Sequence, residues 1–268
     1  MTEAPKTIFD IDFGQLYREH MIASGRQVKA PGDWDARAPR LKAVAPGSRY
    51  VREFVARMDL AGCRSLLDVG CGAGAIGLAV ADRVDQVIGL DYSAGMLEAM
   101  MELAAERGFN HVRPIRASWD DDWRDVPVCD VAVASRSTAV MDLEAALKKL
   151  DAHAGKRAYL TSKVGGYFID PDIAAVIDRK LDPVPDYIYA VNILYQMGRQ
   201  PRVDFLQNDH RPTDCESGDE FVRRVGFSLG RLDDDERKRL AHWFDTNPER
   251  ARASGQPFRW AFIAWETS

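Results

Sequence analysis

Two periods of hydrophobic and polar residues alternate along this chain, and each change of period marks a change of secondary structure. Short apolar runs are typical of strands, whereas apolar residues that recur every three or four positions predict helices. Five strand-like runs occur in the middle of the chain, with helical patterns between them, at 66–69, 87–91, 112–116, 129–134 and 157–162. Strands that alternate with helices predict an α/β fold with a doubly wound, mostly parallel sheet.

The flanking sequence adds helices and two further strands. Residues 9–24 carry an amphipathic pattern, and Ser48 is a suitable N-cap for the helix that follows it. Between 164 and 201 two Asp/Pro pairs each begin a helix, which gives a helical insertion between the fifth and sixth strands. Strand patterns return at 203–207 and 258–265. We therefore predict seven strands in all, together with N-terminal helices and the insertion.

Composition limits the class of protein. Hydrophobic residues make up 46% and charged residues 29% of the 268 residues, as in ordinary soluble globular proteins. A formal net charge of −5 gives no electrostatic basis for binding nucleic acid or an anionic membrane, so we expect neither partner and a small-molecule substrate instead. The N-terminus lacks the basic and apolar regions of a signal peptide, and no apolar run is long enough to cross a bilayer. We expect a cytoplasmic protein.

The four cysteines give no sign of a cross-linked or metal-binding framework. They stand far apart and without C-x-x-C spacing, at positions 63, 71, 129 and 215. Disulfide scaffolds and structural zinc sites need closer, paired cysteines. We therefore expect free thiols and no bound metal.

The most informative stretch is Leu66–Gly74, in which an apolar run breaks into three glycines spaced two apart. It predicts a buried strand, a tight loop and the N-terminus of a helix, and its glycines let a ligand approach the backbone. Gly70, Gly72 and Ala75 satisfy the dinucleotide fingerprint G-x-G-x-x-G/A, so the spacing alone leaves a nicotinamide nucleotide open as the ligand. Asp68 argues against it, because a carboxylate there would repel a pyrophosphate and favour a cationic ligand.

Two motifs taken together resemble a known family. The segment Leu67–Gly74 (LDVGCGAG), followed by Leu90–Leu97 (LDYSAGML), resembles the class I S-adenosylmethionine-dependent methyltransferases. The resemblance implies a Rossmann-like fold with an antiparallel last strand and S-adenosylmethionine as the cofactor. It implies that Gly70–Gly74 pack on the methionine portion and that Asp91 binds the ribose hydroxyls. It also implies methyl transfer to a small-molecule acceptor by in-line displacement.

On this resemblance, the cofactor-binding residues come from the ends of the first four strands: Asp68, Gly70, Cys71, Gly72, Gly74, Asp91, Tyr92, Ser93, Met96, Ala117, Ser118, Trp119 and Ser135. The family usually has an acid that accepts a hydrogen bond from the adenine amino group, and that position is Ala117 here. Asp120 or Asp121 is our substitute for that acid, with Trp119 against the adenine ring.

Five residues are candidates for substrate contact or for a lid. Trp34 and Arg37 belong to a Trp-Asp-x-Arg-Ala segment, and a similar segment in many small-molecule methyltransferases helps to close the cofactor pocket. Arg136 follows the fourth strand and suits a clamp for an anionic substrate. Tyr187 and Tyr195 lie in the insertion and could line a roof over the site. No residue stands in a position that identifies a catalytic base.

The resemblance divides the chain into three parts. Residues 1–62 form an N-terminal helical lid segment, 63–163 and 202–268 the S-adenosylmethionine-binding core, and 164–201 an insertion that acts as a cap or as a homodimer face. Two alternatives stay open at this point. One is an NAD(P)-dependent oxidoreductase, which the overlapping glycine pattern allows, and the other is a non-catalytic S-adenosylmethionine-binding protein that acts through an interaction surface.

Overall fold

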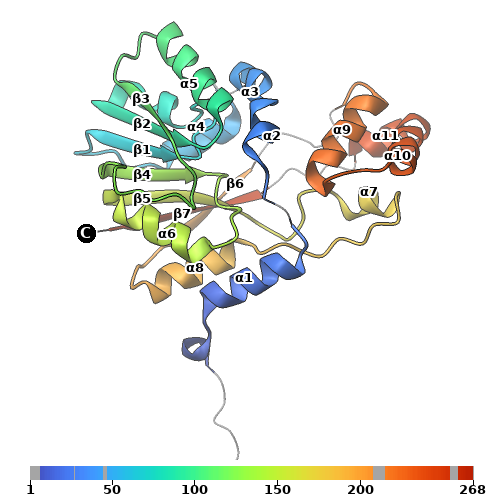
Figure 1. Ribbon diagram of the computed structural model, residues 1–268. Helices are drawn as coiled ribbons and strands as arrows, with labels where there is room; N and C mark the ends of the chain where they lie inside the picture. The colour runs from blue at the N-terminus through green and yellow to red at the C-terminus, as the bar shows by residue number, and fades with distance from the viewer. Residues whose placement is uncertain (1–6, 27, 45–46, 208–214, 254–258, 268) are drawn as a thin grey trace, which may run out of the picture.

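The protein is built around a single twisted sheet (Figure 1). The computed structural model describes residues 7–26, 28–44, 47–207, 215–253 and 259–267. Within them the sheet has seven strands in the order β3-β2-β1-β4-β5-β7-β6. Their bounds are β1 Ser65–Val69, β2 Gln86–Asp91, β3 Val112–Arg116, β4 Cys129–Ser135, β5 Ala154–Lys163, β6 Arg202–Gln207 and β7 Arg259–Glu266. The five strands β1 to β5 pair in parallel, and β7 lies antiparallel between β5 and β6. The predicted fold class is confirmed.

The register explains why the central strands read as apolar runs. Leu67 of β1 stands beside Ile88 of β2 and Ala132 of β4, and all three side chains are buried on one face of the sheet. The preceding residues of the same strands, Leu66 and Val87 among them, are buried on the other face. Because both faces of the sheet are covered, apolar residues occupy successive positions of these strands and do not alternate with polar ones. The hydrophobic effect holds helices on both faces.

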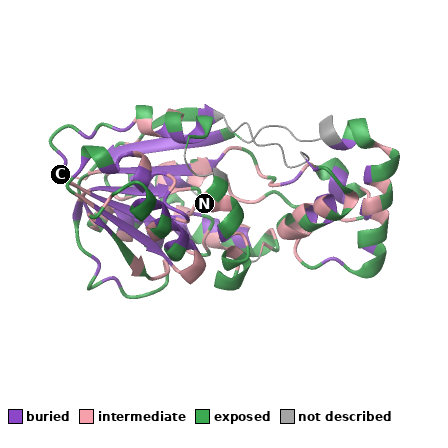
Figure 2. Ribbon diagram, turned by 90° about the horizontal axis from the view of Figure 1, so that it is seen from above, coloured by how far each residue is buried: buried purple, intermediate pink, exposed green. Residues whose placement is uncertain are grey.

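Each face of the sheet has its own layer of helices (Figures 1 and 2). One face is covered by α3 Ala38–Val44, α4 Arg49–Ala56, the 3₁₀ helices η2 Gly77–Ala79 and η3 Ala81–Arg83, and α5 Ala94–Glu106. The other face is covered by α1 Phe13–Ala23, α6 Leu143–Ala152 and α8 Tyr187–Gln196. Two further short helices, η1 Ile8–Asp10 and α2 Pro31–Asp35, belong to the N-terminal segment.

A small helical lobe stands beside the sheet domain (Figures 1 and 2). It consists of α7 Pro171–Ala175, α9 Gly218–Leu229, α10 Asp234–Thr246 and α11 Pro248–Ala253. The lobe has its own core, in which Ile173 of α7 packs with Phe221 and Leu240, and Arg179 makes a bidentate ion pair with Glu236. The sequence-based division assigned all of 202–268 to the sheet core, and α9, α10 and α11 correct that part of it.

The predicted insertion divides into two different parts. Its first helix, α7, joins the lobe, whereas α8 buries Ala190, Ile193 and Leu194 against the sheet. The expectation that the whole of 164–201 forms a cap or a homodimer face therefore does not describe α8. Most of its apolar side is already covered by the sheet, and Ile188 and Tyr195 are its exposed large hydrophobic residues.

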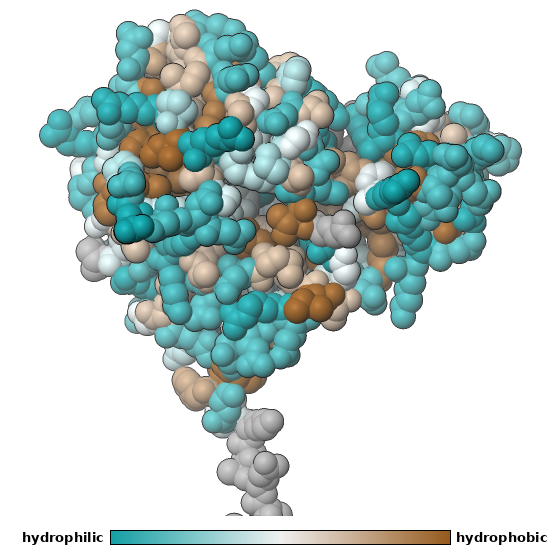
Figure 3. All heavy atoms as spheres, viewed as in Figure 1, coloured by the Kyte–Doolittle hydropathy of each residue, from teal (hydrophilic) through white to brown (hydrophobic). Residues whose placement is uncertain are grey.

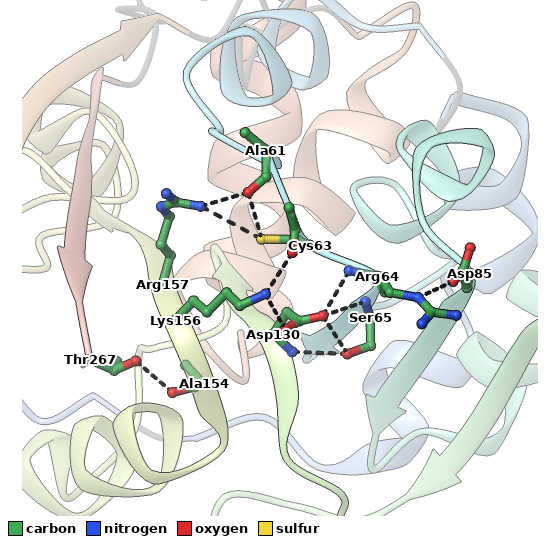
Figure 4. A network of polar contacts seen from close by, with 11 residues as sticks. Ala61, Cys63, Arg64, Ser65, Asp85, Asp130, Ala154, Lys156, Arg157 and Thr267 are labelled. Carbon is green, nitrogen blue, oxygen red and sulfur yellow. Dashed lines mark hydrogen bonds and ion pairs between the residues drawn. The ribbon is translucent and has the colours of Figure 1, made fainter.

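The amino ends of the strands are joined by a polar network (Figure 4). Asp130, near the start of β4, accepts hydrogen bonds from the backbone N–H groups of Arg64 (2.7 Å) and Ser65 (3.2 Å). The same carboxylate makes an ion pair with Lys156 of β5 at 2.8 Å. Cys129 is buried at this edge. These contacts tie three strands together, and the opposite, carboxyl edge is where ligands bind in open α/β sheets.

None of the helices in the described ranges has the length and apolarity needed to cross a membrane. The face of the molecule in Figure 3 is mostly hydrophilic, with hydrophobic side chains in small separate groups.

Candidate cofactor and substrate site

The loop after β1 depends on glycine for two different reasons. Gly70, Gly72 and Gly74 all have positive φ, at 64°, 53° and 78°, in a region that L-residues rarely occupy. A Cβ at Gly70 would lie 2.3 Å from the Cβ of Ser137, and one at Gly74 would lie 2.7 Å from the Cγ of Met100. At Gly72 the nearest atom would be 3.8 Å away. The loop is therefore packed closely at both ends and has space beside its middle glycine.

The helix predicted directly after this loop is absent, which corrects the sequence interpretation. Residues 71–76 form turns, and two 3₁₀ helices, η2 and η3, follow. The N–H of Gly77, which a helix would turn toward a ligand, donates instead to Oδ2 of Asp68 at 2.9 Å. A Cβ at Gly77 would also lie 3.0 Å from Val87. Side-chain capture of the amide and close packing on β2 hold the chain in tighter turns.

Asp68 is a buried carboxylate, 1% exposed, in the middle of β1. Burial raises its pKa to about 7, the hydrogen bond from Gly77 opposes this, and the nearby charge of Asp91 adds to it. The sequence predicts that Asp68 faces a cationic ligand. In the structure its carboxylate accepts the hydrogen bond from Gly77 of the loop itself, so its first role is to hold the turn at Gly77.

We expect Asp68→Asn to change how stability depends on pH. The folded-state pKa of Asp68 lies above its ordinary value of 3.8, so the folded protein binds that proton more tightly and the free energy of unfolding falls as pH rises from about 4 to about 7. Asparagine keeps an oxygen for Gly77 and has no charge to bury. One pKa unit corresponds to about 1.4 kcal/mol, and about 1 kcal/mol moves the Tm of a chain this size by roughly 2–4 °C.

The measurement is the Tm without cofactor at pH 5 and at pH 8. The Tm of Asp68→Asn minus the Tm of the native protein should be several degrees larger at pH 8 than at pH 5. Asp245→Asn, a change at an exposed carboxylate, is the control and should follow the native protein. Equal pH dependence in all three proteins would show that Asp68 is not a strained buried charge.

Asp91 joins the two sequence motifs. It ends β2 and is 6% exposed, and its two oxygens accept from different backbone amides. Oδ2 accepts from Gly72 of the glycine loop and Oδ1 from Ser93, each at 2.9 Å. Burial raises the pKa of Asp91, and these hydrogen bonds, which favour the charged form, work against that rise. Ser93 in turn caps α5 by accepting from Met96.

The N-terminal segment closes over this corner of the sheet. Oδ1 of Asp35, at the end of α2, accepts from the hydroxyl of Ser93 at 2.6 Å and from the N–H of Gly95 at 2.9 Å. The hydroxyl of Tyr92 donates to the carbonyl of Lys29 at 2.9 Å. Sequence reasoning did not select Asp35, although it lies inside the Trp-Asp-x-Arg-Ala segment.

Trp34 and Arg37 face the small lobe. The ring of Trp34 meets that of Phe227 on α9 edge to face, with centroids 5.5 Å apart, and the guanidinium of Arg37 lies 3.8 Å from the centre of the same ring. These two candidates therefore join the N-terminal segment to the lobe. Together with the hydrogen bonds of Asp35, these contacts connect the N-terminus of α5 to α9.

Replacing Asp35 with alanine should loosen this segment. The variant loses an acceptor at the N-terminus of α5, a contribution of about 1 kcal/mol, and so we expect dissociation of the cofactor to become about fivefold faster. Hydrogen exchange should also accelerate at 28–36 but not in β1 or β2. Asp12→Ala, which removes a comparable cap from α1, is the control. An unchanged dissociation rate in Asp35→Ala would contradict a lid role.

The loop after β3 lies between Asp91 and the end of β4. The N–H of Ala117 donates to the backbone carbonyl of Asp91 at 3.2 Å, and the indole N–H of Trp119 donates to the carbonyl of Ser137 at 2.9 Å. Trp119 also stacks on Trp123 at 5.2 Å. These contacts bring the predicted adenine-side residues to the same edge as Asp91.

Of the two acids proposed as adenine partners, Asp121 is hydrogen-bonded within its own loop and Asp120 is exposed to solvent. Asp121 accepts from the N–H of Ser118 at 2.7 Å, and that hydrogen bond is the largest cause of its lowered pKa. Asp121 is thus committed to the turn that begins at Ser118, and a role for either acid toward adenine stays a prediction.

The ends of β4 and β5 share a hydroxyl network that the sequence did not reveal. The hydroxyl of Tyr50 lies 2.8 Å from that of Ser135 and 2.7 Å from that of Thr161, and Tyr50 is 1% exposed. Burial raises the pKa of Tyr50, so the phenol stays protonated. Arg136 has φ of 58° and donates its N–H to Thr161 at 3.0 Å.

Three candidates, Cys71, Met96 and Tyr187, lie in packing positions, and Tyr195 does not. Cys71 and Met96 are buried in the core on the α5 side, and burial raises the pKa of the Cys71 thiol well above its usual value. Tyr187 packs edge to face on Phe205 with centroids 5.6 Å apart. Tyr195 is 52% exposed near the end of α8, and its contact with a substrate stays a prediction.

A cavity of about 550 Å³ lies between α4, η2 and α5. Of the candidate cofactor residues, Gly74 lines it, and its walls are otherwise apolar side chains such as Val51, Leu78 and Leu103 with arginines at the rim. Neither Asp91 nor the end of β4 borders it, so we do not assign it to the cofactor. Among the residues that the structure describes, no three His, Cys, Asp or Glu side chains gather as metal ligands.

Similarity to known proteins agrees with this geometry. The fold is similar to that of coclaurine N-methyltransferase crystallised with N-methylheliamine and S-adenosylhomocysteine (TM-score 0.54, 14% identity, covering 97% of this chain and 96% of that one). It is also similar to the [4+2]-cyclase SpnF (TM-score 0.56, 18% identity, covering 88% and 94%). An uncharacterized protein of Haemophilus influenzae is 35% identical over 266 residues, which covers 97% of this chain and 98% of that protein. Residues 66–154 match the methyltransferase domain family.

Residues 66–154 belong to the methyltransferase domain family. The resemblance inferred from the two motifs is thereby confirmed, and the cofactor of this family is S-adenosylmethionine. The glycine pattern that also allowed a nicotinamide nucleotide is the methyltransferase loop. The matched range begins in β1 and ends at the start of β5, so it includes both motifs but not the lobe.

Proposed function

We propose that this methyltransferase transfers the methyl group of S-adenosylmethionine to a small-molecule acceptor by in-line displacement. One observation carries the proposal: the carboxylate of Asp91 accepts from both Gly72 and Ser93, so the loop and the acid of the two motifs meet at one point. Each carboxylate oxygen has two lone pairs and receives one of these N–H groups. Acceptor capacity for the ribose hydroxyls therefore remains.

The surroundings of Asp91 suit the rest of the cofactor. The space beside Gly72, where an added side chain would meet nothing nearer than 3.8 Å, suits the methionine portion. Ala117, Ser118 and Trp119 lie on the other side of Asp91 and suit the adenine. We further propose that residues 1–62 act as a lid, since Asp35 anchors this segment on α5.

The chain mainly has to orient the acceptor. When bound, the cofactor supplies a methyl carbon made electrophilic by its sulfonium, and orientation alone can contribute about 7–11 kcal/mol. Tyr50 keeps its proton and links Ser135 to Thr161, so it fixes the end of β4 and does not act as a base. Since Tyr50 does not act as a base, we infer that the acceptor atom is already nucleophilic and reacts without a strong base.

Titration calorimetry followed by turnover tests the proposal. The native protein should bind S-adenosylmethionine and S-adenosylhomocysteine but neither NAD⁺ nor NADP⁺. With labelled S-adenosylmethionine and a fractionated metabolite extract, label should enter a small molecule with an equal amount of S-adenosylhomocysteine formed. Binding with no transfer from any fraction would favour a non-catalytic role, and preferential binding of NAD⁺ would overturn the assignment.

A further inference from the structure

A row of aromatic rings and cations lies along the carboxyl ends of β4 and β5 and the amino end of the antiparallel strand β7. The guanidinium of Arg136 lies 4.3 Å from the centre of the Tyr50 ring. The ring of Tyr50 meets that of Trp260 edge to face, with centroids 6.3 Å apart. Trp260 of β7 stands opposite Lys163 of β5 in the sheet register, so their side chains project from the same face. The contacts thus run without a break from the end of β4 to the end of β5.

The row continues into the segment after β5. The ring of Phe168 is shared by two cations: the guanidinium of Arg26 lies 3.9 Å from its centre and the ammonium of Lys163 5.3 Å from it. Lys163 also donates to the carbonyl groups of Val164 (3.3 Å) and Gly165 (3.1 Å). Burial lowers the pKa of Lys163 to about 8, and the positive charge of Arg26 contributes to this. Arg26 itself is partly buried, and burial lowers its pKa.

Two of the arginines at this edge lack a carboxylate partner, whereas Lys163 has the negative charge of Asp186 near it. Within the described part of the chain, Arg26 and Arg136 make no ion pair with a carboxylate, whereas Arg57, Arg179 and Arg199 each have one within 2.8 Å. The formal net charge of the whole chain is −5, so the imbalance is local. Arg26 is partly removed from water and has no carboxylate partner, which is costly, and this cost falls when an anion binds.

Two further features mark the same place. The indole N–H of Trp260, a residue 8% exposed, has no hydrogen-bond partner in the described structure. A buried donor without a partner costs about 1–3 kcal/mol. Arg136 holds φ of 58°, a left-handed conformation that a side chain with a Cβ adopts only at a cost. Unsatisfied donors and strained residues are typical of ligand-binding positions.

We propose that the methyl acceptor is a small organic anion whose charged group binds between Arg136 and Arg26. Lys163 and the indole N–H of Trp260 complete the set of donors, and the apolar part of the acceptor lies against the partly exposed ring of Phe168. A carboxylate and a phosphate share this chemistry, since both accept bidentate hydrogen bonds from arginine. The inference rests on the proposed function, because it identifies the substrate class of the same site.

The test is a titration of the full chain loaded with S-adenosylhomocysteine. The probes are benzoate, phenyl phosphate and benzamide, the last being the neutral counterpart of benzoate. At least one anion should bind at least about tenfold more tightly than benzamide, as expected for charge-assisted hydrogen bonds. The tighter of the two anions identifies the source as a carboxylate or a phosphate.

Arg136→Gly separates binding from folding. Glycine accepts the left-handed backbone without strain and keeps the N–H donated to Thr161, so the Tm should stay close to the native value. The affinity for the anion should fall at least about tenfold, while the affinity for S-adenosylhomocysteine stays the same. Arg26→Met should weaken the anion similarly. Arg113→Met, at an exposed arginine on β3, is the matched control and should change neither.

The outcomes distinguish the two proposals. If S-adenosylhomocysteine binds but the anions bind no better than benzamide, or if Arg136→Gly behaves like Arg113→Met, the anion site is wrong and the methyltransferase proposal stands. If S-adenosylhomocysteine does not bind to the native protein, the proposed function itself fails.

Discussion

Replacing Asp91 with alanine should weaken the binding of S-adenosylmethionine and S-adenosylhomocysteine at least about 100-fold. Two ribose hydroxyls would each lose a hydrogen bond to a charged acceptor, and such bonds contribute about 1.5–3 kcal/mol each. Circular dichroism should show the same secondary structure as the native protein, because Asp91 stands at the end of β2 and the strand pairing does not use its side chain. Calorimetric titration measures the affinity.

Two companion variants make this result interpretable. Alanine also leaves the N–H groups of Gly72 and Ser93 without their acceptor, which lowers the stability of the loop. Asp91→Asn keeps one of the two acceptors, so it should fold more stably and still lose much of the affinity. Asp85→Ala changes an exposed carboxylate just before the amino end of the same strand and should bind normally. Native affinity in both Asp91 variants would remove the ribose assignment.

Gly70→Ala should lower the free energy of unfolding more than any other glycine-to-alanine change in the sheet domain. Alanine at φ of 64° costs about 1–2 kcal/mol, and its Cβ would lie 2.3 Å from that of Ser137, which adds about 1–3 kcal/mol of overpacking. The matched control is Gly62→Ala, at φ of 69° with no atom within 4 Å of its added Cβ. Urea unfolding should show the larger loss for Gly70→Ala, together with loss of cofactor binding.

A second substitution tests the cause. Ser137→Gly removes the Cβ that the new methyl group meets, at the cost of the hydrogen bond from the Ser137 hydroxyl to Val69. The double variant Gly70→Ala/Ser137→Gly should therefore recover at least about 1 kcal/mol relative to the sum of the single changes. Strict additivity would mean that the contact between the loop and the end of β4 is not what requires glycine.

The sheet was readable from the sequence because its strands are local patterns. All seven predicted strands lie within a few residues of the observed ones, since short apolar runs bounded by turn residues need no distant information. The absence of a helix after the glycine loop could not be predicted from the sequence. It depends on a hydrogen bond from the amide of Gly77 to Asp68, nine residues earlier, and on packing against Val87. Propensity alone does not include such tertiary contacts.

Other site residues could not be predicted for the same reason, since their contacts are with residues far away in the sequence. Tyr50 counted toward the apolar face of a helix, and its hydroxyl partners lie 85 and 111 residues away. Arg26 and Lys163 are 137 residues apart in the sequence and come together on Phe168. The second motif gave Asp91 correctly because its neighbours, Gly72 and Ser93, belong to the motifs themselves. The contacts of a motif residue can be predicted when its partners belong to the motifs, and contacts between residues far apart in the sequence cannot.

A crystal structure of the protein grown with S-adenosylhomocysteine tests the central claim most directly. We expect the nucleoside at the carboxyl edge, with its ribose hydroxyls on the carboxylate of Asp91 and its amino-acid portion along Gly70–Gly74. A loop that stays empty, a nucleoside bound elsewhere, or a preference for a dinucleotide whose pyrophosphate lies on these glycines would contradict it.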